Sequence, residues 1–130
     1  MSSIFTKIIN GEIPSYKILE NDHFLAFLDV FPLAKGHCLV IPKAEVDNIF
    51  DLEDNALSEL HLFSKKVAKA MEKSFDCLKI GVSVIGLEVP HAHIHLIPMN
   101  SVSDMNFAKD KLSFSKEEML EVQQRIQSNL

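Results

Sequence analysis

The chain has little of what would assign it to a membrane, a secretory route or a nucleic-acid partner. Its 130 residues contain no run of about twenty apolar residues, which a membrane span needs. No basic segment followed by an apolar run opens the chain, so we expect no signal peptide. Lysine and arginine total 13 against 18 aspartates and glutamates, and this acidic balance argues against a nucleic-acid polymer as partner.

Cysteine is also scarce, with only Cys38 and Cys77. Both lie in apolar surroundings without the spacing of a metal site, so we predict free buried thiols and a reducing, cytoplasmic compartment. Apolar residues make up 47% of the chain and charged residues 24%, as in a soluble globular protein. We predict one domain spanning residues 1–130. A small anionic ligand is compatible with the acidic charge, because local donors can hold a phosphate.

Hydrophobic periodicity and capping signals divide the chain into short strands and three helices. Gly11 ends the first helix, because glycine readily takes a positive φ, and Ser115 with Glu118 forms a capping box at the start of the last. We predict helices over residues 4–9, 53–74 and 115–129, and strands over residues 16–19, 24–30, 37–42, 78–85 and 91–98. Residues 99–114 are predicted to be irregular.

These elements predict an α+β fold. The first three strands have short connections and pair most simply as antiparallel neighbours. We expect a five-stranded antiparallel sheet with one long central helix and a C-terminal helix, and with helices covering one face. Each of the two longer helices has one apolar stripe: Leu57, Leu60, Val67, Met71 and Phe75 in the central helix, and Met119, Val122 and Ile126 in the C-terminal helix.

Three of the six histidines alternate in the segment His91-Ala92-His93-Ile94-His95. Side chains alternate between the two faces of a β-strand, so all three imidazoles should project from one face. The apolar residues between them should enter the core on the other face. The expected result is a row of imidazoles on the sheet face that the helices leave uncovered.

Such a row has three interpretations. In a metal site, neighbouring histidines about 6.6 Å apart can share an ion but the outer pair, about 13 Å apart, cannot, so a further ligand such as His37 is needed. In nucleophilic catalysis at phosphorus, one imidazole attacks while a second binds the phosphate oxygens. In the third interpretation, the histidines occupy a solvated sheet face and have no role.

The run from His91 to Ile97 resembles the His-φ-His-φ-His-φ-φ signature of the histidine triad (HIT) proteins, where φ is an apolar residue. Four further blocks resemble the nucleotide-binding branch of that family, at residues 4–14, 27–32, 36–43 and 86–90. The similarity covers residues 4–98, which would form the core of a single HIT-like domain. The C-terminal extension with the helix over 115–129 is not diagnostic.

The resemblance implies a role for each site residue. His93 resembles the nucleophile that attacks the α-phosphorus of a nucleoside monophosphate derivative, and His95 the histidine that binds the α-phosphate or its bridging atom. His91 and His37 resemble the pair that orients and assists the nucleophile. Asp29 resembles the carboxylate that accepts hydrogen bonds from the ribose hydroxyls. The apolar base pocket would consist of Ile4, Phe5, Ile8, Ile13, Phe27, Val30 and Leu39. Core packing explains these apolar residues equally well.

Several positions depart from the family pattern, among them Met99, which replaces a basic residue or glycine after the triad strand. Ser3 and Thr6 stand where many bacterial relatives have a Cys-x-x-Cys zinc pair, and Glu45 stands where they have a zinc histidine. We therefore predict no metal. Ser83 is the candidate for a phosphate-side asparagine, and Glu88 replaces a serine that donates to the leaving group in some relatives. Unless it is protonated or turned away, a carboxylate there repels phosphate, so we expect an effect on catalytic rate more than on nucleotide binding.

The favoured interpretation is a cofactor-independent hydrolase that cleaves purine nucleoside phosphoramidates or related nucleoside monophosphate conjugates through a covalent histidine–nucleotidyl intermediate. One alternative is the hydrolysis of dinucleoside polyphosphates. Another is a nucleotide-binding scaffold with little turnover. The resemblance also implies a homodimer whose subunits join their sheets.

Overall fold

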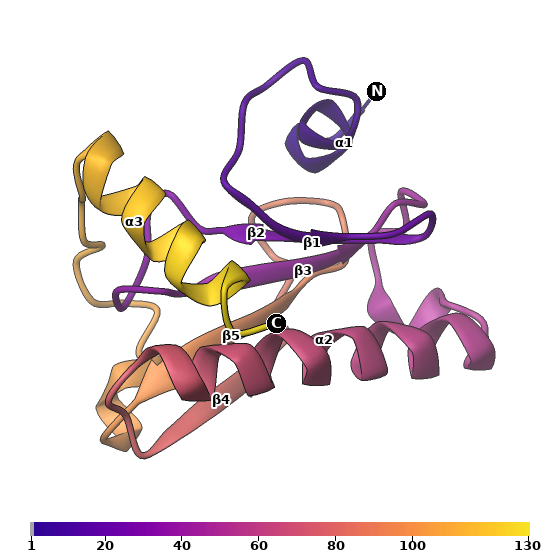
Figure 1. Cartoon of the computed structure of the whole chain (residues 1–130). Helices are drawn as coiled ribbons and strands as arrows, with labels where there is room; N and C mark the ends of the chain where they lie inside the picture. Colours follow the sequence, from indigo (N-terminus) through magenta and orange to yellow (C-terminus); the bar gives the residue numbers. More distant parts are fainter. Residues whose placement is uncertain (1) are drawn as a thin grey trace.

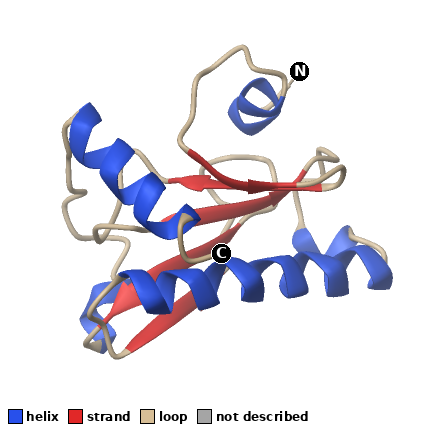
Figure 2. Cartoon of the chain, viewed as in Figure 1, coloured by secondary structure: helices blue, strands red, loops and turns tan. Residues whose placement is uncertain are grey.

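The computed structural model describes residues 2–130, and a five-stranded antiparallel sheet forms its centre (Figures 1 and 2). The strands are β1 (Lys17–Glu20), β2 (Phe24–Leu28), β3 (Cys38–Pro42), β4 (Lys79–Ser83) and β5 (Ile94–Met99). Their order across the sheet is β1-β2-β3-β5-β4, and every neighbouring pair is antiparallel. The predicted fold is confirmed, and β5, the strand that follows the first two triad histidines, pairs on both sides.

Three α-helices accompany the sheet, and all three were predicted to within two residues. They are α1 (Ile4–Ile9), α2 (Asp54–Ser74) and α3 (Lys116–Gln127). Two 3-10 turns, η1 (Ile49–Asp51) and η2 (Val102–Met105), were not predicted. The second falls in the segment expected to be irregular, where Ser101 and Asp104 form a capping box that closes a single turn. None of the helices described here has the length and apolar character that a membrane span requires.

All five strands differ from the predicted ranges by at least one residue, and three of them, the second, the fourth and the fifth, differ by more than one residue at an end. The second strand ends at Leu28 instead of Val30, because the next residues turn, with the Phe31 N–H donating to the Asp29 carboxylate. The fourth covers Lys79–Ser83 only. The fifth begins at Ile94, so His91 and His93 precede it. The Ala92 N–H donates to the carbonyl of Val46 (2.7 Å), outside the sheet ladder.

Two apolar layers cover the two faces of the sheet. One layer packs α2 and α3 against residues of the sheet, among them Ile94 and Leu96, and against Ala92 just before β5, as predicted for the apolar residues that alternate with the histidines. The predicted helix stripes belong to it, although Leu57 and Phe75 are only partly buried. Full burial of such a side chain contributes about 1.5–3 kcal/mol.

The second layer corrects the expectation that helices cover only one face. Helix α1 lies on the opposite side of the sheet from α2 (Figure 1) and packs Phe5 and Ile8 against alternate residues of β2 and β3. Glycine ends this helix as predicted, with Gly11 at φ 79°. The histidine face is therefore covered instead of solvated, and His37, His91, His93 and His95 are all buried.

Helix α3 is fixed beside β1 at the far edge of the sheet. Its predicted capping box forms, with the Glu118 N–H donating to the Ser115 hydroxyl and the Ser115 N–H to the Glu118 carboxylate, each at 3.1 Å. The Gln123 side-chain amide donates to the Lys17 carbonyl (2.8 Å). Both cysteines are free thiols; Cys38 is buried as predicted, whereas Cys77 is partly exposed. To reach α3 from β5, residues 100–115 must cross the sheet end that carries the histidines.

Candidate active site

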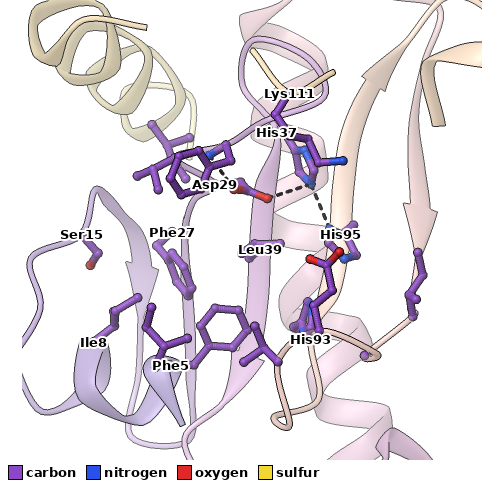
Figure 3. Close-up of a pocket in the computed structure, with 18 of the residues that line it drawn as sticks. Phe5, Ile8, Ser15, Phe27, Asp29, His37, Leu39, His93, His95 and Lys111 are labelled. Atoms are coloured by element: carbon purple, nitrogen blue, oxygen red, sulfur yellow. Dashed lines mark hydrogen bonds and ion pairs between the residues drawn. The ribbon is translucent and has the colours of Figure 1, made fainter. Parts of the chain in front are cut away.

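A cavity of about 390 Å³ opens between α1, the end of β2, the loop before the triad and the segment that precedes α3. Figure 3 shows the side chains that converge on it. The cavity contains twelve residues that sequence analysis assigned to the site: His37, His93, His95, Asp29, Glu88, Ile4, Phe5, Ile8, Ile13, Phe27, Val30 and Leu39. Two assigned residues do not line it. His91 is fully buried, and Ser83 lies in β4, opposite His95 in the strand register.

The apolar wall has a double function. Phe5, Phe27 and Leu39 are buried in the second core layer and also face the cavity. Ile4 and Val30 are half exposed at its rim. The two interpretations of these residues, core packing and pocket lining, therefore apply together.

His37 is held in one orientation by the turn before it. Gly36 has φ 92°, and a Cβ there would lie 2.3 Å from the Phe75 ring, so only glycine fits. The Leu33 N–H donates to His37 Nδ1 (3.0 Å). Because Nδ1 accepts this bond, the proton of the neutral ring is on Nε2. Burial is the main cause that lowers the pKa of His37 to about 4, so the ring is neutral at pH 7.

The tautomer of His37 determines that of His95. His37 Nε2 lies 3.0 Å from His95 Nδ1 and donates its proton to that atom. His95 Nδ1 is therefore an acceptor, and its Nε2 carries the proton. Burial also lowers the pKa of His95, to about 3. Every fully buried side-chain nitrogen and oxygen in the described chain has a partner, so the unpartnered Nε2–H of His95 is accessible from the cavity.

His93 has the opposite tautomer. Its Nδ1 lies 2.7 Å from the carbonyl oxygen of His91, which can only accept, so Nδ1 carries the proton and Nε2 a free lone pair. Burial lowers the pKa of His93 below its usual 6.5, which keeps that lone pair free at neutral pH. The ring centroids of His93 and His95 are 4.9 Å apart. Adjacent rings thus present a nucleophilic nitrogen and a hydrogen-bond donor to the same cavity.

His91 supports this arrangement from below. Its Nε2 donates to the carbonyl of Pro42 (2.7 Å), so its Nδ1 accepts from the Ser3 hydroxyl (2.8 Å). Ser3 in turn accepts from the Thr6 N–H (3.0 Å) and caps α1. The Ser3 N–H and the Thr6 hydroxyl both donate to one carboxylate oxygen of Glu45, at 2.5 and 2.6 Å. Hydrogen bonds thus join Ser3, Thr6 and Glu45, the three positions at which the resemblance implies zinc ligands in many bacterial relatives.

Asp29 lies directly after β2 and has one carboxylate oxygen free. Its Oδ1 accepts from the Phe31 N–H (2.9 Å), whereas Oδ2 accepts no hydrogen bond from the part of the chain that the structure describes. Oδ2 is 3.6 Å from His37 Nε2, and this contact is not an ion pair because His37 is neutral. Burial raises the pKa of Asp29. The free oxygen can accept from a hydroxyl group.

Asp29, His37 and His95 also bring three potential metal ligands within 4.8 Å of one another. The metal site considered from the sequence combined two triad histidines with His37. Of the triad, only His95 belongs to the group found in the structure. A metal at this point would require a lone pair on His37 Nε2, but the Leu33 N–H on Nδ1 leaves Nε2 protonated. In this hydrogen-bonding arrangement, the Nε2 proton of His37 lies between the His37 and His95 rings.

Ten residues that line the cavity were not predicted as site residues, and two of them, Phe107 and Lys111, come from the segment that was predicted to be irregular. The Phe107 ring packs edge-on against His95, with centroids 4.7 Å apart. Lys111 donates to the Phe107 carbonyl (2.7 Å). No periodic pattern or motif marks either residue. Both lie in an irregular segment whose path over the site depends on where β5 and α3 are placed in the fold, and a local sequence pattern does not contain that information.

A family model for the HIT domain matches residues 10–102. The chain therefore belongs to the HIT family of nucleotide-binding hydrolases.

Similar proteins cover most of the chain. An uncharacterized HIT-like protein of Borreliella burgdorferi is 35% identical over 135 residues, which cover 98% of this chain and 97% of that protein. Adenosine 5'-monophosphoramidase HNT1 of Saccharomyces cerevisiae is 42% identical over 96 residues, covering 73% of this chain and 61% of the yeast protein. A crystal structure of a Hit-like protein from Bartonella henselae superimposes with a TM-score of 0.86 at 33% identity, covering 99% of this chain and 96% of that one.

Proposed function

We propose that the protein hydrolyses purine nucleoside phosphoramidates or related nucleoside monophosphate conjugates through a covalent adduct on His93. The observation that carries this proposal is the pair of tautomers: His93 Nε2 has a free lone pair and His95 Nε2 has a proton, side by side in one cavity. Two similar yeast proteins bear the name adenosine 5'-monophosphoramidase, which supports the substrate class.

The reaction has two displacements at the α-phosphorus. In the first, the Nε2 lone pair of His93 forms a bond to phosphorus while the bond from phosphorus to the leaving nitrogen breaks. The leaving amine keeps the electron pair and takes a proton from water. In the second, water attacks phosphorus, the bond to Nε2 breaks, and nucleoside monophosphate and a proton are released. The second step returns His93 to its starting tautomer.

The surrounding groups stabilise the charges that develop. As His93 bonds to phosphorus its ring becomes positive, and the His91 carbonyl at Nδ1 stabilises that charge. The His95 Nε2–H donates to a phosphate oxygen or to the bridging atom. The apolar wall with Phe5 and Phe27 takes the planar base, and Asp29 Oδ2 accepts from the ribose hydroxyls.

We further propose that the protein acts as a cytoplasmic homodimer. Strand β4 pairs with β5 on one side only and forms an edge of the sheet. Leu78, Val82 and Leu87, in and beside this edge, are exposed apolar residues, and an unprotected edge strand invites pairing with a second strand. The free thiols fit a reducing compartment. Light scattering should give twice the chain mass of 14.7 kDa; a monomer at micromolar concentration would contradict the dimer.

The central test is turnover of an adenosine phosphoramidate with a trap for the intermediate. Wild type should release adenosine monophosphate, and rapid acid quenching followed by peptide mass spectrometry should find one adenylyl group on His93. His93→Ala should lose several kcal/mol of transition-state stabilisation, on the order of a thousandfold or more in rate. His61→Ala, at an exposed histidine of α2, is the matched control and should be unaffected. Turnover by His93→Ala near the wild-type rate would refute the mechanism.

A further inference from the structure

Ser15 lines the end of the cavity that is remote from the triad histidines. It lies in the segment between α1 and β1. The sheet order places β1 on one side of β2 and β3, and β5 on the other. Figure 3 shows the result, with Ser15 on one side of Phe27 and the histidines on the opposite side. The cavity therefore extends across four strands, and Ser15 lies at its β1 end.

The cavity around Ser15 is otherwise apolar. The lining residues next to it in the chain are Ile13 and Pro14, and Ile8 of α1 lies beside it in Figure 3. The remaining polar side chains that line the cavity in the described chain come from other segments and are Asp29, His37, Glu88, His93, His95 and Lys111. A polar group of a ligand that enters this end therefore has the Ser15 hydroxyl as its side-chain partner.

The Ser15 hydroxyl is free and its backbone is held in place. The hydroxyl forms no side-chain hydrogen bond within the described residues 2–130, and every fully buried polar side-chain atom there has a partner, so this oxygen is accessible. Pro14, directly before it, has a fixed φ, and the carbonyl of Tyr16, directly after it, accepts from the Leu28 N–H (3.0 Å). A group held in this way loses little freedom when it binds a ligand.

The proposed substrate provides a partner for this hydroxyl. The phosphorus is attacked by His93, and the ribose hydroxyls donate to Asp29 at the end of β2. The base is attached to the ribose on the side away from the phosphate, so it extends past Phe27 toward β1. The purine edge far from the sugar carries the group at position 6, which is an amino group in adenine and an oxo group in guanine. Such a group loses its water in an apolar cavity and needs a hydrogen-bond partner there.

We propose that Ser15 is a specificity-determining residue whose hydroxyl binds the group at position 6 of a purine base. A hydroxyl both donates and accepts, so it can bind the amino group of adenine as well as the oxo group of guanine. The site then selects purines that carry a polar group at position 6 and accepts both common purine bases. This inference rests on the proposed function, which places the phosphate at His93 and the ribose at Asp29.

The test measures the affinities of three nucleoside 5'-monophosphates by calorimetry. The adenosine and purine riboside compounds differ only in the amino group at position 6, and the cytidine compound has a smaller base that should not reach Ser15. Wild type should bind adenosine monophosphate about three- to tenfold more tightly than the purine riboside compound, the range for one neutral hydrogen bond. Ser15→Ala should abolish this preference and leave the cytidine monophosphate affinity unchanged. Ser58→Ala, at an exposed serine of α2 outside the cavity, should preserve it.

A structural role of Ser15 would give a different result. Equal wild-type affinities for the two purine compounds, a ratio that Ser15→Ala leaves unchanged, or an equal loss for all three nucleotides would overturn the inference. The thermal unfolding midpoint of Ser15→Ala should match that of wild type, because the hydroxyl has no partner within the described chain. If wild type does not cleave an adenosine phosphoramidate while the affinity ratio depends on Ser15, the proposed function fails and the role of Ser15 stands. If adenosine monophosphate does not bind, both fail.

Discussion

Replacing Ser3 by alanine should destabilise the protein far more than its position near the chain end suggests. The Ser3 hydroxyl accepts from the Thr6 N–H and so caps α1, and it donates to His91 Nδ1 at 2.8 Å. Ser3 is 5% exposed and His91 0% exposed, so water cannot replace the lost partner. The substitution therefore removes a helix cap and leaves a buried acceptor without a donor.

The expected cost follows from these two losses. Loss of a serine cap costs about 1 kcal/mol, and a buried acceptor without a partner costs about 1–3 kcal/mol. The free energy of unfolding should therefore fall by about 2–4 kcal/mol, a large share of the roughly 5–15 kcal/mol that stabilises a typical domain. Helix α1 should also loosen. This would disturb the packing of Phe5, on this helix, against His93, where the ring centroids are 5.0 Å apart.

Denaturant unfolding at pH 7 measures the cost directly. Wild type, Ser3→Ala and the control Ser58→Ala are compared by circular dichroism; Ser58 is exposed on α2. The control should stay within about 0.5 kcal/mol of wild type, as surface substitutions do. A Ser3→Ala protein that loses less than about 0.5 kcal/mol would show that the hydrogen bonds from Ser3 to His91 and α1 do not stabilise the fold, and would refute this reasoning.

The exposed end of the same network adds a pH dependence. Donation from the Ser3 N–H and the Thr6 hydroxyl lowers the pKa of Glu45 below 4.5. A carboxylate with a lowered folded-state pKa stabilises the protein above its unfolded value, and this contribution is lost as pH falls through the folded value. Glu45→Gln should therefore flatten the stability loss below pH 4.5 and leave the stability curve above pH 6 nearly parallel to that of wild type.

Three further outcomes are expected. Wild type should bind adenosine monophosphate more tightly than its 2'-deoxy analogue by about 1–3 kcal/mol in calorimetry, and Asp29→Asn should shrink this gap; equal wild-type affinities would remove Asp29 from the site. Elemental analysis should find less than about 0.1 zinc per chain, since structural sites bind tightly; stoichiometric zinc that leaves together with the fold on chelation would contradict the absence of a metal. The free energy of unfolding should fall as pH drops from 6.5 toward 4, because burial lowers the pKa of His37 to about 4 and the unfolded chain then binds more protons; His37→Asn should reduce that slope.

Helices and strands were predictable where the local sequence pattern and the tertiary packing favour the same conformation. Helix α3 is an example, because its capping box and its stripe with Met119 and Val122 depend on residues within a few positions of one another. Strand ends were less predictable. Val30 is apolar like the strand before it, but the Asp29 carboxylate captures the Phe31 N–H and turns the chain, which no alternation of apolar residues reveals.

The covering of the histidine face was not predictable from the same patterns. Helix α1 has only six residues, and its apolar side chains could have packed on either face of the sheet. Its place is determined by Ser3, which bonds to His91, and by Glu45, which receives two hydrogen bonds from the first residues of the chain. These contacts join positions that are distant in the sequence, so no local window contains them.

The alternation of the triad histidines predicts neighbouring rings, but it does not predict what those rings can do. Whether a ring nitrogen offers a lone pair or a proton depends on its other nitrogen. For His93 that partner is the carbonyl of His91, and for His95 it is His37, whose own tautomer depends on the N–H of Leu33. If His37 had the other tautomer, its Nε2 would be an acceptor and His95 Nδ1 would have to donate to it. His95 Nε2 would then carry a lone pair instead of a proton, so the cavity would have two nucleophilic nitrogens and no histidine donor for the phosphate. The turn from Leu33 to His37, closed by Gly36, is therefore as necessary to the chemistry as the triad itself.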